Sequence, residues 1–196
     1  YESATVGGAL RLAHVLKVAA QKAGWGTKKL PPNTAMGIAV SSAEERQSPT
    51  WVAGIAEVTV DPATGNVKIN RLTIAMDMGI AVNPMNIKAQ IQGSALWGAS
   101  QILSEKLTLK NGAFEQTNFH EYMPIRLENI PQIDVEIVQS QRHPSGVGEP
   151  ASTVVAPAVA NAIFNAVGSR VRQMPITAEA VLVDVRTDAE REWVGF

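Results

Sequence analysis

The 196-residue sequence contains no cysteine, and this absence removes several kinds of chemistry at once. A chain without thiols forms no disulfide, has no cysteine nucleophile, and binds neither zinc nor an iron–sulfur cluster through thiolates. Charged residues make up only 18% of the sequence, compared with a typical value of about 25%. Hydrophobic residues make up 45%. This balance predicts a sizeable core and a surface partly covered by a partner or by the rest of a longer chain.

A basic excess and a long apolar run are also missing. The 17 Lys and Arg residues are balanced by 18 Asp and Glu residues, for a net charge of -1, so no nucleic-acid or anionic-membrane partner is expected. No apolar run approaches the roughly 20 residues that span a bilayer. The chain starts at Tyr1 without a basic and then apolar leader. We therefore expect a processed or cloned fragment, with any targeting signal outside it, and leave its compartment open.

The spacing of apolar residues predicts both helices and strands. Helices are expected over residues 5–23, 84–104 and 156–167, and strands over 36–41, 52–60, 67–76 and 133–138, with a polar loop over 42–50 and a short hairpin near 107–112. Helices and antiparallel hairpins together indicate an α+β fold with mixed or antiparallel sheets and packed helices. The length suits one domain over 1–196, or two small α+β subdomains divided near 80–110.

Capping residues define the ends of these helices. Gly24 and Gly168 directly follow the first and last helix, where a left-handed glycine commonly ends a helix. Asn83 and Pro84 stand at the start of the middle helix, as N-cap and first helical residue.

The middle helix has one flank with almost no side-chain bulk. The small residues are Gly93, Ser94, Ala95, Gly98, Ala99 and Ser100. Each glycine costs about 1 kcal/mol relative to alanine in a helix, so a compensating role is expected. One explanation is close packing on a sheet or a second helix. The other is the close approach of a ligand to the helix backbone.

The loop that ends in Gly146-Val147-Gly148-Glu149-Pro150 is the strongest candidate for chemistry. Its glycines allow backbone conformations closed to other residues and a close approach to a ligand. Pro150 restricts Glu149 to extended conformations, so a stiff backbone aims the carboxylate. Two interpretations remain open on these residues alone: Glu149 is a general base, or it only caps the helix that follows.

Other candidates are weaker. His14, His120 and His143 are scattered, and no pair has metal-ligand spacing, so no metal site is predicted. Ser145 lacks the G-x-S-x-G context of a hydrolase nucleophile. Gly146-x-Gly148 lacks the third glycine and the strand-turn-helix setting of a dinucleotide site.

Four stretches of the sequence form a recognisable set in this order: Ala23-Gly24-Trp25-Gly26; Asp77-Met78-Gly79 through Asn83-Pro84, Gln90 and Gly93; Asn118-Phe119 with Tyr122 and Arg126; and Gly146–Pro150 followed by Ala156–Ile163. Together they resemble the last part of the molybdopterin-binding large subunit of xanthine oxidase and aldehyde oxidase-type molybdenum hydroxylases. Within that family the sequence is most similar to the isoquinoline 1-oxidoreductase β-subunit group, with related aldehyde and nicotinate dehydrogenases. The resemblance extends from about Val15 to Ile176 and implies the C-terminal portion of the molybdenum-cofactor-binding domain.

This resemblance implies an enzyme that hydroxylates an N-heterocycle or an aldehyde with water as the oxygen source. In the family the glutamate of the last stretch lies beside the molybdenum and acts as a base, which implies that role for Glu149. A carboxylate can act in this way near neutral pH in a partly apolar pocket. Gln90 and Gly148 match positions close to the cofactor in relatives, and the small-residue flank would then admit a bulky pterin.

The resemblance also implies cofactors and partners. The cofactor would be a molybdenum–pterin, in its cytosine dinucleotide form, and [2Fe–2S] clusters would lie only in a small partner subunit. The remainder of the large subunit and a small-molecule substrate complete the expected partners.

Two substitutions and one absence distinguish this sequence from the family pattern. Met78 stands where relatives often have cysteine, and Ser145 where glycine is frequent. A glycine–phenylalanine–glycine segment, which lies near the metal in relatives, does not occur here. We therefore expect only part of the site in this chain, inactive alone. The alternative is a non-catalytic assembly domain in which Glu149 caps a helix and the small-residue flank is a protein interface.

Overall fold

The centre of the fold is a four-stranded mixed sheet. The structure is a computed structural model that describes residues 8–45 and 48–182. The strand order is β1-β2-β3-β6, with β1 Thr34–Glu45, β2 Ser48–Val60, β3 Val67–Asp77 and β6 Gln132–Ile137. The first three strands are antiparallel, whereas β6 runs parallel to β3. The α+β prediction with a mixed sheet is confirmed.

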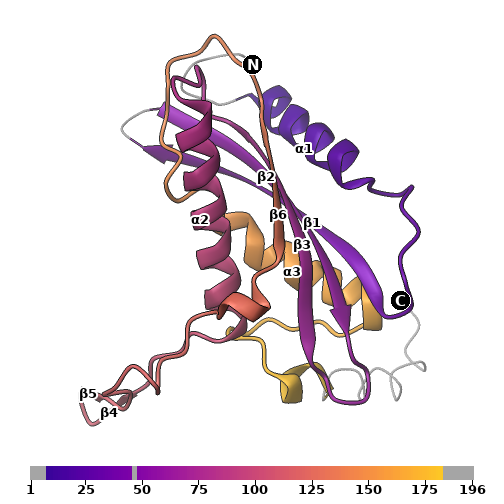
Figure 1. Cartoon of the computed structure of the whole chain (residues 1–196), viewed down its shortest axis with the longest axis vertical. Helices are drawn as coiled ribbons and strands as arrows, with labels where there is room; N and C mark the ends of the chain where they lie inside the picture. Colours follow the sequence, from indigo (N-terminus) through magenta and orange to yellow (C-terminus); the bar gives the residue numbers. More distant parts are fainter. Residues whose placement is uncertain (1–7, 46–47, 183–196) are drawn as a thin grey trace.

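Helices cover both faces of this sheet (Figure 1). Helix α1, Ala9–Ala23, packs on one face, where Trp51, Ala53 and Ile55 of β2 meet Val15 and Ala19. Helix α3, Ser152–Val167, packs on the other face, and α2, Pro84–Leu103, lies against α3 and β6. Residues of both parities along β2 are therefore buried, which explains why its sequence is apolar throughout rather than alternating.

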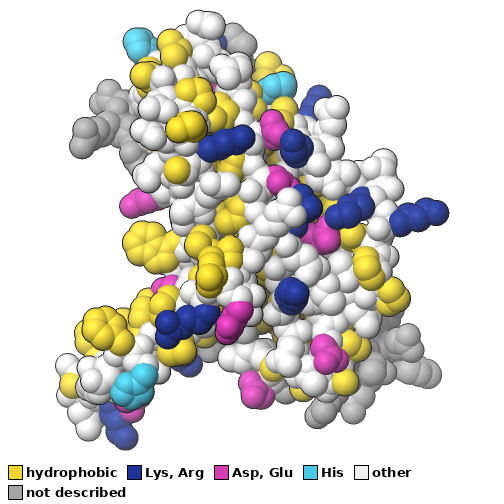
Figure 2. Space-filling view, viewed as in Figure 1, with side chains coloured by type: hydrophobic (Ala, Val, Ile, Leu, Met, Phe, Trp, Pro, Cys, Tyr) yellow, Lys and Arg dark blue, Asp and Glu magenta, His cyan; other side chains and the backbone are white. Residues whose placement is uncertain are grey.

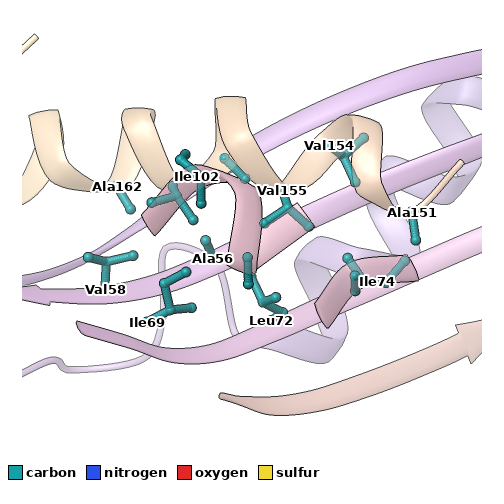
Figure 3. Close-up of a cluster of buried hydrophobic side chains, with 14 of the residues drawn as sticks. Ala56, Val58, Ile69, Leu72, Ile74, Ile102, Ala151, Val154, Val155 and Ala162 are labelled. Atoms are coloured by element: carbon teal, nitrogen blue, oxygen red, sulfur yellow. The ribbon is translucent and has the colours of Figure 1, made fainter. Parts of the chain in front are cut away.

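A bulge in β3 changes which residues face α3. Glu57 pairs with Arg71 but Val58 pairs with Ile69, so Asn70 is the extra residue. The β3 residues in the core beneath α3 accordingly change from an odd position, Ile69, to even positions, as in Leu72 and Ile74. The register thus keeps the apolar side chains of both halves of β3 in one core, which Figure 3 shows beneath α3.

Helix α3 lies directly on the backbone of β1. A Cβ atom at Gly37 would be 2.0 Å from the carbonyl oxygen of Ala158, so only glycine permits this approach. Asn161 and Asn165 donate from their side-chain amides to the carbonyl oxygens of Ile38 and Met36, at 3.0 and 2.9 Å. These contacts fix α3, and the loop before it, relative to the sheet.

Two predicted boundaries were wrong. The polar segment 42–50 was expected as a loop, but its described residues, 42–45 and 48–50, belong to β1 and β2, where Ser42 pairs with Trp51. Cross-strand pairing stabilises an extended backbone here although local apolar signals are lacking. The last helix begins at Ser152 and not at Ala156, with Pro157 inside it. The hydroxyl groups of Ser152 and Thr153 donate to the carbonyl oxygens of Glu149 and Pro150, at 2.8 and 2.7 Å, and anchor this earlier turn.

Other predicted boundaries agree with the structure. Gly24 adopts φ 71° and ends α1, whereas the predicted start at Thr5 lies outside the described residues. Asn83 accepts a hydrogen bond from the Asn86 N–H at 3.1 Å and caps α2, with Pro84 as its first residue. Gly168 ends α3 in the left-handed conformation.

Between α2 and β6 the chain forms an arm that projects from the body (Figure 1). It carries the short hairpin of β4, Leu109–Lys110, and β5, Ala113–Phe114, and returns through a 3-10 helix, η1, Leu127–Asn129. Hydrophobic side chains gather on this arm and over α2 (Figure 2). No helix in the described part of the chain is both long and apolar enough to cross a membrane.

Candidate active site

The candidate site lies where α2 meets the loop that precedes α3. Ser94, buried on α2, donates from its hydroxyl to the carbonyl oxygen of Glu149 at 3.0 Å and accepts from the Ser152 N–H at 3.0 Å. The Glu149 carbonyl oxygen also accepts from the N–H and the hydroxyl of Ser152, at 2.9 and 2.8 Å. The backbone of Glu149 is therefore held by three donors.

The side chain of Glu149 is exposed, in contrast to its backbone. Its carboxylate accepts no hydrogen bond from any residue that the structure describes. The N-cap of α3 is Ala151, with no side-chain cap. Among the described residues, the Glu149 carboxylate therefore makes no capping hydrogen bond to α3, and the contacts that anchor this residue use its backbone carbonyl oxygen. The apolar enclosure expected around a base is not supplied by these residues either.

Gln90 and Gly148 lie beside each other across the same junction. A Cβ atom at Gly148 would be 3.7 Å from the side-chain nitrogen of Gln90, an ordinary contact distance. Neither Gly146 nor Gly148 has a positive φ, so the expectation that their conformations are closed to other residues is wrong. The absent side chain of Gly148 instead keeps the space next to the exposed Gln90 amide open.

Two hollows flank the junction of Gln90 with Gly148. The first, about 260 Å³, lies toward the start of α2 and is lined by Met78, Ile80, Val82, Asn83, Asn86, Ile87, Gln90, Pro144, Ser145 and Val147. The second, about 310 Å³, lies further along α2 and is lined by Ser94, Trp97, Gln101, Gly148, Glu149, Ser152 and Thr153. One stripe of α2 contributes to both hollows, because Gln90, Ser94, Trp97 and Gln101 recur at helical spacing.

The other end of the loop is fixed to the sheet by Ser145. Its backbone N–H and its hydroxyl donate to the carbonyl oxygen of Met78, at 2.8 and 3.1 Å. Its hydroxyl also lies 2.7 Å from that of the buried Thr50, which reaches the Gly146 carbonyl oxygen at 2.7 Å. Ser145 is therefore a structural residue, and the rejection of a serine nucleophile agrees with its position.

The end of β3 supports the loop from below. A Cβ atom at Gly79, where φ is 81°, would lie 2.1 Å from the His143 carbonyl oxygen. The Asp77 carboxylate, almost fully buried, accepts a hydrogen bond from the Gly79 N–H at 3.1 Å. Arg11 of α1 forms a two-point ion pair with Asp77 at 2.6 and 2.7 Å. The motif Asp77-Met78-Gly79 thus connects α1, the sheet and the loop.

The small-residue flank of α2 mainly serves helix packing. A Cβ atom at Gly98 would lie 3.0 Å from the Val155 Cβ and 3.1 Å from the Ser152 carbonyl oxygen. Ala95 and Ala99 are fully buried in the same core. At Gly93, the other glycine of this flank, a Cβ atom would have no neighbour within 4 Å. The packing explanation is therefore right for Gly98. The other explanation, that a ligand approaches the helix backbone, stays open only at Gly93 on this flank.

The Asn118–Tyr122 stretch lies near the far end of α2. Tyr122 donates to the Glu105 carboxylate, and Ser100 donates to the same group. The hydrogen bond to Glu105, followed by burial, raises the pKa of Tyr122. This cluster attaches the projecting arm to α2, at the opposite end from Gln90.

The three histidines do not form a site. His14 is on α1, His120 on the arm and His143 in the loop, and all three are exposed. Within residues 8–45 and 48–182 there is no group of three or more His, Cys, Asp or Glu residues that could hold a metal ion.

Sequence reasoning missed the residues that hold Glu149 in place. Ser94 was taken only as a small residue, and Trp97, Gln101 and Ser152 were not singled out. The spacing of Gln90, Ser94, Trp97 and Gln101 was the available signal for a common face. The pairing of Ser94 with Glu149 had none, because it joins residues 55 positions apart.

Comparison with known proteins identifies the protein family of this chain. Residues 13–131 match the sequence model of the family described as "Molybdopterin cofactor-binding domain". The chain belongs to this family. Gln90 lies inside the matched range, whereas Gly148 and Glu149 follow it. The resemblance to the molybdenum-binding subunits of xanthine oxidase-type hydroxylases is confirmed.

Individual relatives support the same assignment. The chain is 46% identical over 178 residues to the membrane-bound aldehyde dehydrogenase (pyrroloquinoline-quinone) of Gluconacetobacter polyoxogenes, covering 91% of this chain and 23% of that protein. It is 29% identical over 166 residues to isoquinoline 1-oxidoreductase subunit beta of Brevundimonas diminuta, covering 85% and 21%. The fold resembles quinoline 2-oxidoreductase from Pseudomonas putida 86, with a TM-score of 0.65, 21% identity, and coverage of 70% and 19%. The chain thus spans about a fifth of the length of these relatives.

The residues at the junction fit an organic cofactor of this class. The Gln90 amide can both donate and accept hydrogen bonds, is exposed, and faces space left by Gly148. Gly93, on the same helix, adds open surface without a side chain. The chemistry and open space of these residues fit one edge of a molybdenum–pterin.

Proposed function

We propose that this chain contributes the general base, Glu149, and one edge of the cofactor site to a molybdenum hydroxylase acting on an aldehyde or an N-heterocycle. In this proposal the chain is the C-terminal portion of the cofactor-binding domain, and the rest of the large subunit completes the site. One observation carries the proposal: three donors hold the backbone of Glu149, directly after Gly148, which lies beside Gln90. Among the described residues the Glu149 carboxylate has no hydrogen-bond partner.

The molybdenum–pterin group, when bound, would supply the oxidising centre. Gln90 would orient this group through its side-chain amide, and Gly148 would leave room for it beside Gln90. Glu149 would accept a proton from the water-derived oxygen that adds to the electron-poor substrate carbon. A base must lie within hydrogen-bond reach of that proton, and the fixed backbone of Glu149 limits the positions its carboxylate can occupy.

The proposal includes a specific cofactor and a partner. The cofactor would be the cytosine dinucleotide form of molybdopterin, and electrons would leave through [2Fe–2S] clusters in a small subunit, because this chain has no cysteine. The name of one relative includes pyrroloquinoline-quinone instead. Analysis of the purified, active enzyme for molybdenum, iron, pterin nucleotide and quinone distinguishes these cases. Activity without molybdenum or iron would contradict the proposal.

The substitution Glu149→Gln tests the base directly in the assembled enzyme. Glutamine keeps the volume of the side chain and the backbone contacts but cannot accept a proton near neutral pH. Turnover per bound molybdenum should fall by about 10²–10⁴-fold, with molybdenum content unchanged. The matched control is Glu128→Gln, which removes an exposed carboxylate from η1, and it should leave turnover as in the wild type.

A purely structural Glu149 predicts a different result. If its carboxylate stabilised α3, glutamine would cost on the order of 1 kcal/mol of stability and leave turnover per molybdenum nearly intact. That outcome would remove the base from the proposal and favour the assembly-domain alternative.

A further inference from the structure

Ser94 connects α2, which carries Gln90, with the loop that carries Glu149. It lies on α2, one helical turn after Gln90, and its side chain is buried. Its hydroxyl donates to the Glu149 carbonyl oxygen and accepts from the Ser152 N–H, both at 3.0 Å. In the described part of the chain, both hydrogen bonds between α2 and residues 149–152 use this one hydroxyl.

The hydrogen bonds of Ser94 differ from those of an ordinary helical serine. A serine in a helix often donates to the carbonyl oxygen four residues earlier, and Ser104, the C-cap of α2, makes the same bond to Ser100 at 3.2 Å. That bond stays within one helix and connects nothing else. Ser94 instead reaches a different segment of the chain. Serine is also a weaker helix former than alanine, so local helix stability does not explain its presence.

The start of α3 would persist without the Ser94 hydroxyl. The Glu149 carbonyl oxygen would keep the N–H and the hydroxyl of Ser152 as donors, at 2.9 and 2.8 Å. The Ser152 N–H would keep that carbonyl oxygen as acceptor. No buried polar group would be left unsatisfied, so the cost in stability should be small. The contact that would be lost is the one that fixes Glu149 relative to α2.

We propose that Ser94 is a positioning residue that holds Glu149 in register with Gln90. Because Gln90 and Ser94 are on the same helical stripe, this hydrogen bond sets the distance between the cofactor edge and the base. The inference rests on the proposed function, in which Gln90 orients the cofactor and Glu149 takes the proton. A displacement of about 1 Å in a reacting group can lower a rate by about 10²-fold.

The test is a double-mutant cycle in the assembled, molybdenum-loaded enzyme. Ser94→Ala should lower kcat per bound molybdenum by about 10–10²-fold, with KM and molybdenum content close to the wild type. Ser104→Ala, which also removes a hydroxyl bonded to a carbonyl oxygen of α2, should change neither parameter. In a Glu149→Gln background, Ser94→Ala should cause no further loss, because the group that it positions is already inactive.

Hydrogen exchange of the cofactor-free assembled enzyme gives a readout that does not depend on turnover. Ser94→Ala should accelerate amide exchange at residues 148–153, and Ser104→Ala should not. Unchanged kcat in Ser94→Ala would overturn the positioning role, as would a further loss of the same size in the Glu149→Gln background. If Glu149→Gln alone keeps full turnover, the proposed function fails. If Glu149→Gln is inactive but Ser94→Ala is not, only the inference about Ser94 fails.

Discussion

Two glycines on α2 should respond in different ways to the same substitution. Gly93 and Gly98 are both inside the helix, and alanine at either position gains about 1 kcal/mol of helix propensity. At Gly93 the new methyl group would meet nothing within 4 Å. At Gly98 it would lie 3.0 Å from the Val155 Cβ and 3.1 Å from the Ser152 carbonyl oxygen. Non-bonded carbon atoms prefer separations of about 3.5–4.0 Å, so α3 would have to move.

The difference between the two variants isolates this packing cost, because the gain in helix propensity cancels. Inserting a methyl group into a packed core costs about 1–3 kcal/mol. For a domain of this size 1 kcal/mol corresponds to about 2–4 °C in Tm, so Gly98→Ala should melt roughly 2–12 °C below Gly93→Ala. Gly98→Ala should also lower turnover, because the displaced atoms of Ser152 adjoin Glu149.

Thermal unfolding of both variants in the assembled enzyme, with molybdenum assayed in each sample, provides the measurement. Equal Tm values would show that α2 and α3 are not in the close contact described here. Molybdenum content adds a second comparison. If the cofactor approaches the helix backbone at Gly93, then Gly93→Ala should lose molybdenum although its Tm rises. Unchanged content would show that the open surface at Gly93 has no part in cofactor binding.

Two further predictions concern the chain surface and the arm. The isolated chain should self-associate and bind no molybdenum cofactor tightly, because Val82, Met85, Phe119 and Leu127 are 79%, 81%, 96% and 87% exposed; a cofactor-loaded monomer in sedimentation would contradict this. The hydrogen bond to Glu105 raises the pKa of Tyr122. The stability that this hydrogen bond contributes should therefore be complete below the ordinary pKa of tyrosine, about 10, and should be lost as the pH rises through the raised pKa. An absorbance titration should show that Tyr122 ionises at a higher pH than an ordinary tyrosine. If Tyr122→Phe lost as much stability at high pH as the wild type, the loss would not come from ionisation of Tyr122.

The sequence predicted those parts of the fold that are determined by interactions between residues close together in the chain. Asn83 and Pro84 start α2 because a side-chain cap and a fixed φ act within one turn. The strand residues 42–45 and 48–50 were missed because their extended backbone depends on pairing between β1 and β2. The start of α3 was placed too late because Pro157 resembles a first helical residue, whereas hydroxyl groups at Ser152 and Thr153 begin the helix a turn earlier.

The candidate site shows the same division. Glu149 and Gly148 were proposed from a motif and Gln90 from the family resemblance, but nothing local to the motif indicated how its backbone is held. That support comes from Ser94 on one side and from Thr50 and Ser145 on the other, through contacts 55 and 95 positions apart in the sequence.

The way Glu149 is held also bears on why a carboxylate could serve as a base here. A carboxylate engaged by several donors favours its charged form and becomes a weaker base. At Glu149 the donors bind the backbone carbonyl oxygen instead, so the position of the residue is restricted without using the side chain. The carboxylate can then respond to whatever covers the adjoining hollow. This separation explains how one exposed glutamate could be both well placed and chemically available, and it is the property that Ser94→Ala should disturb while leaving the carboxylate in place.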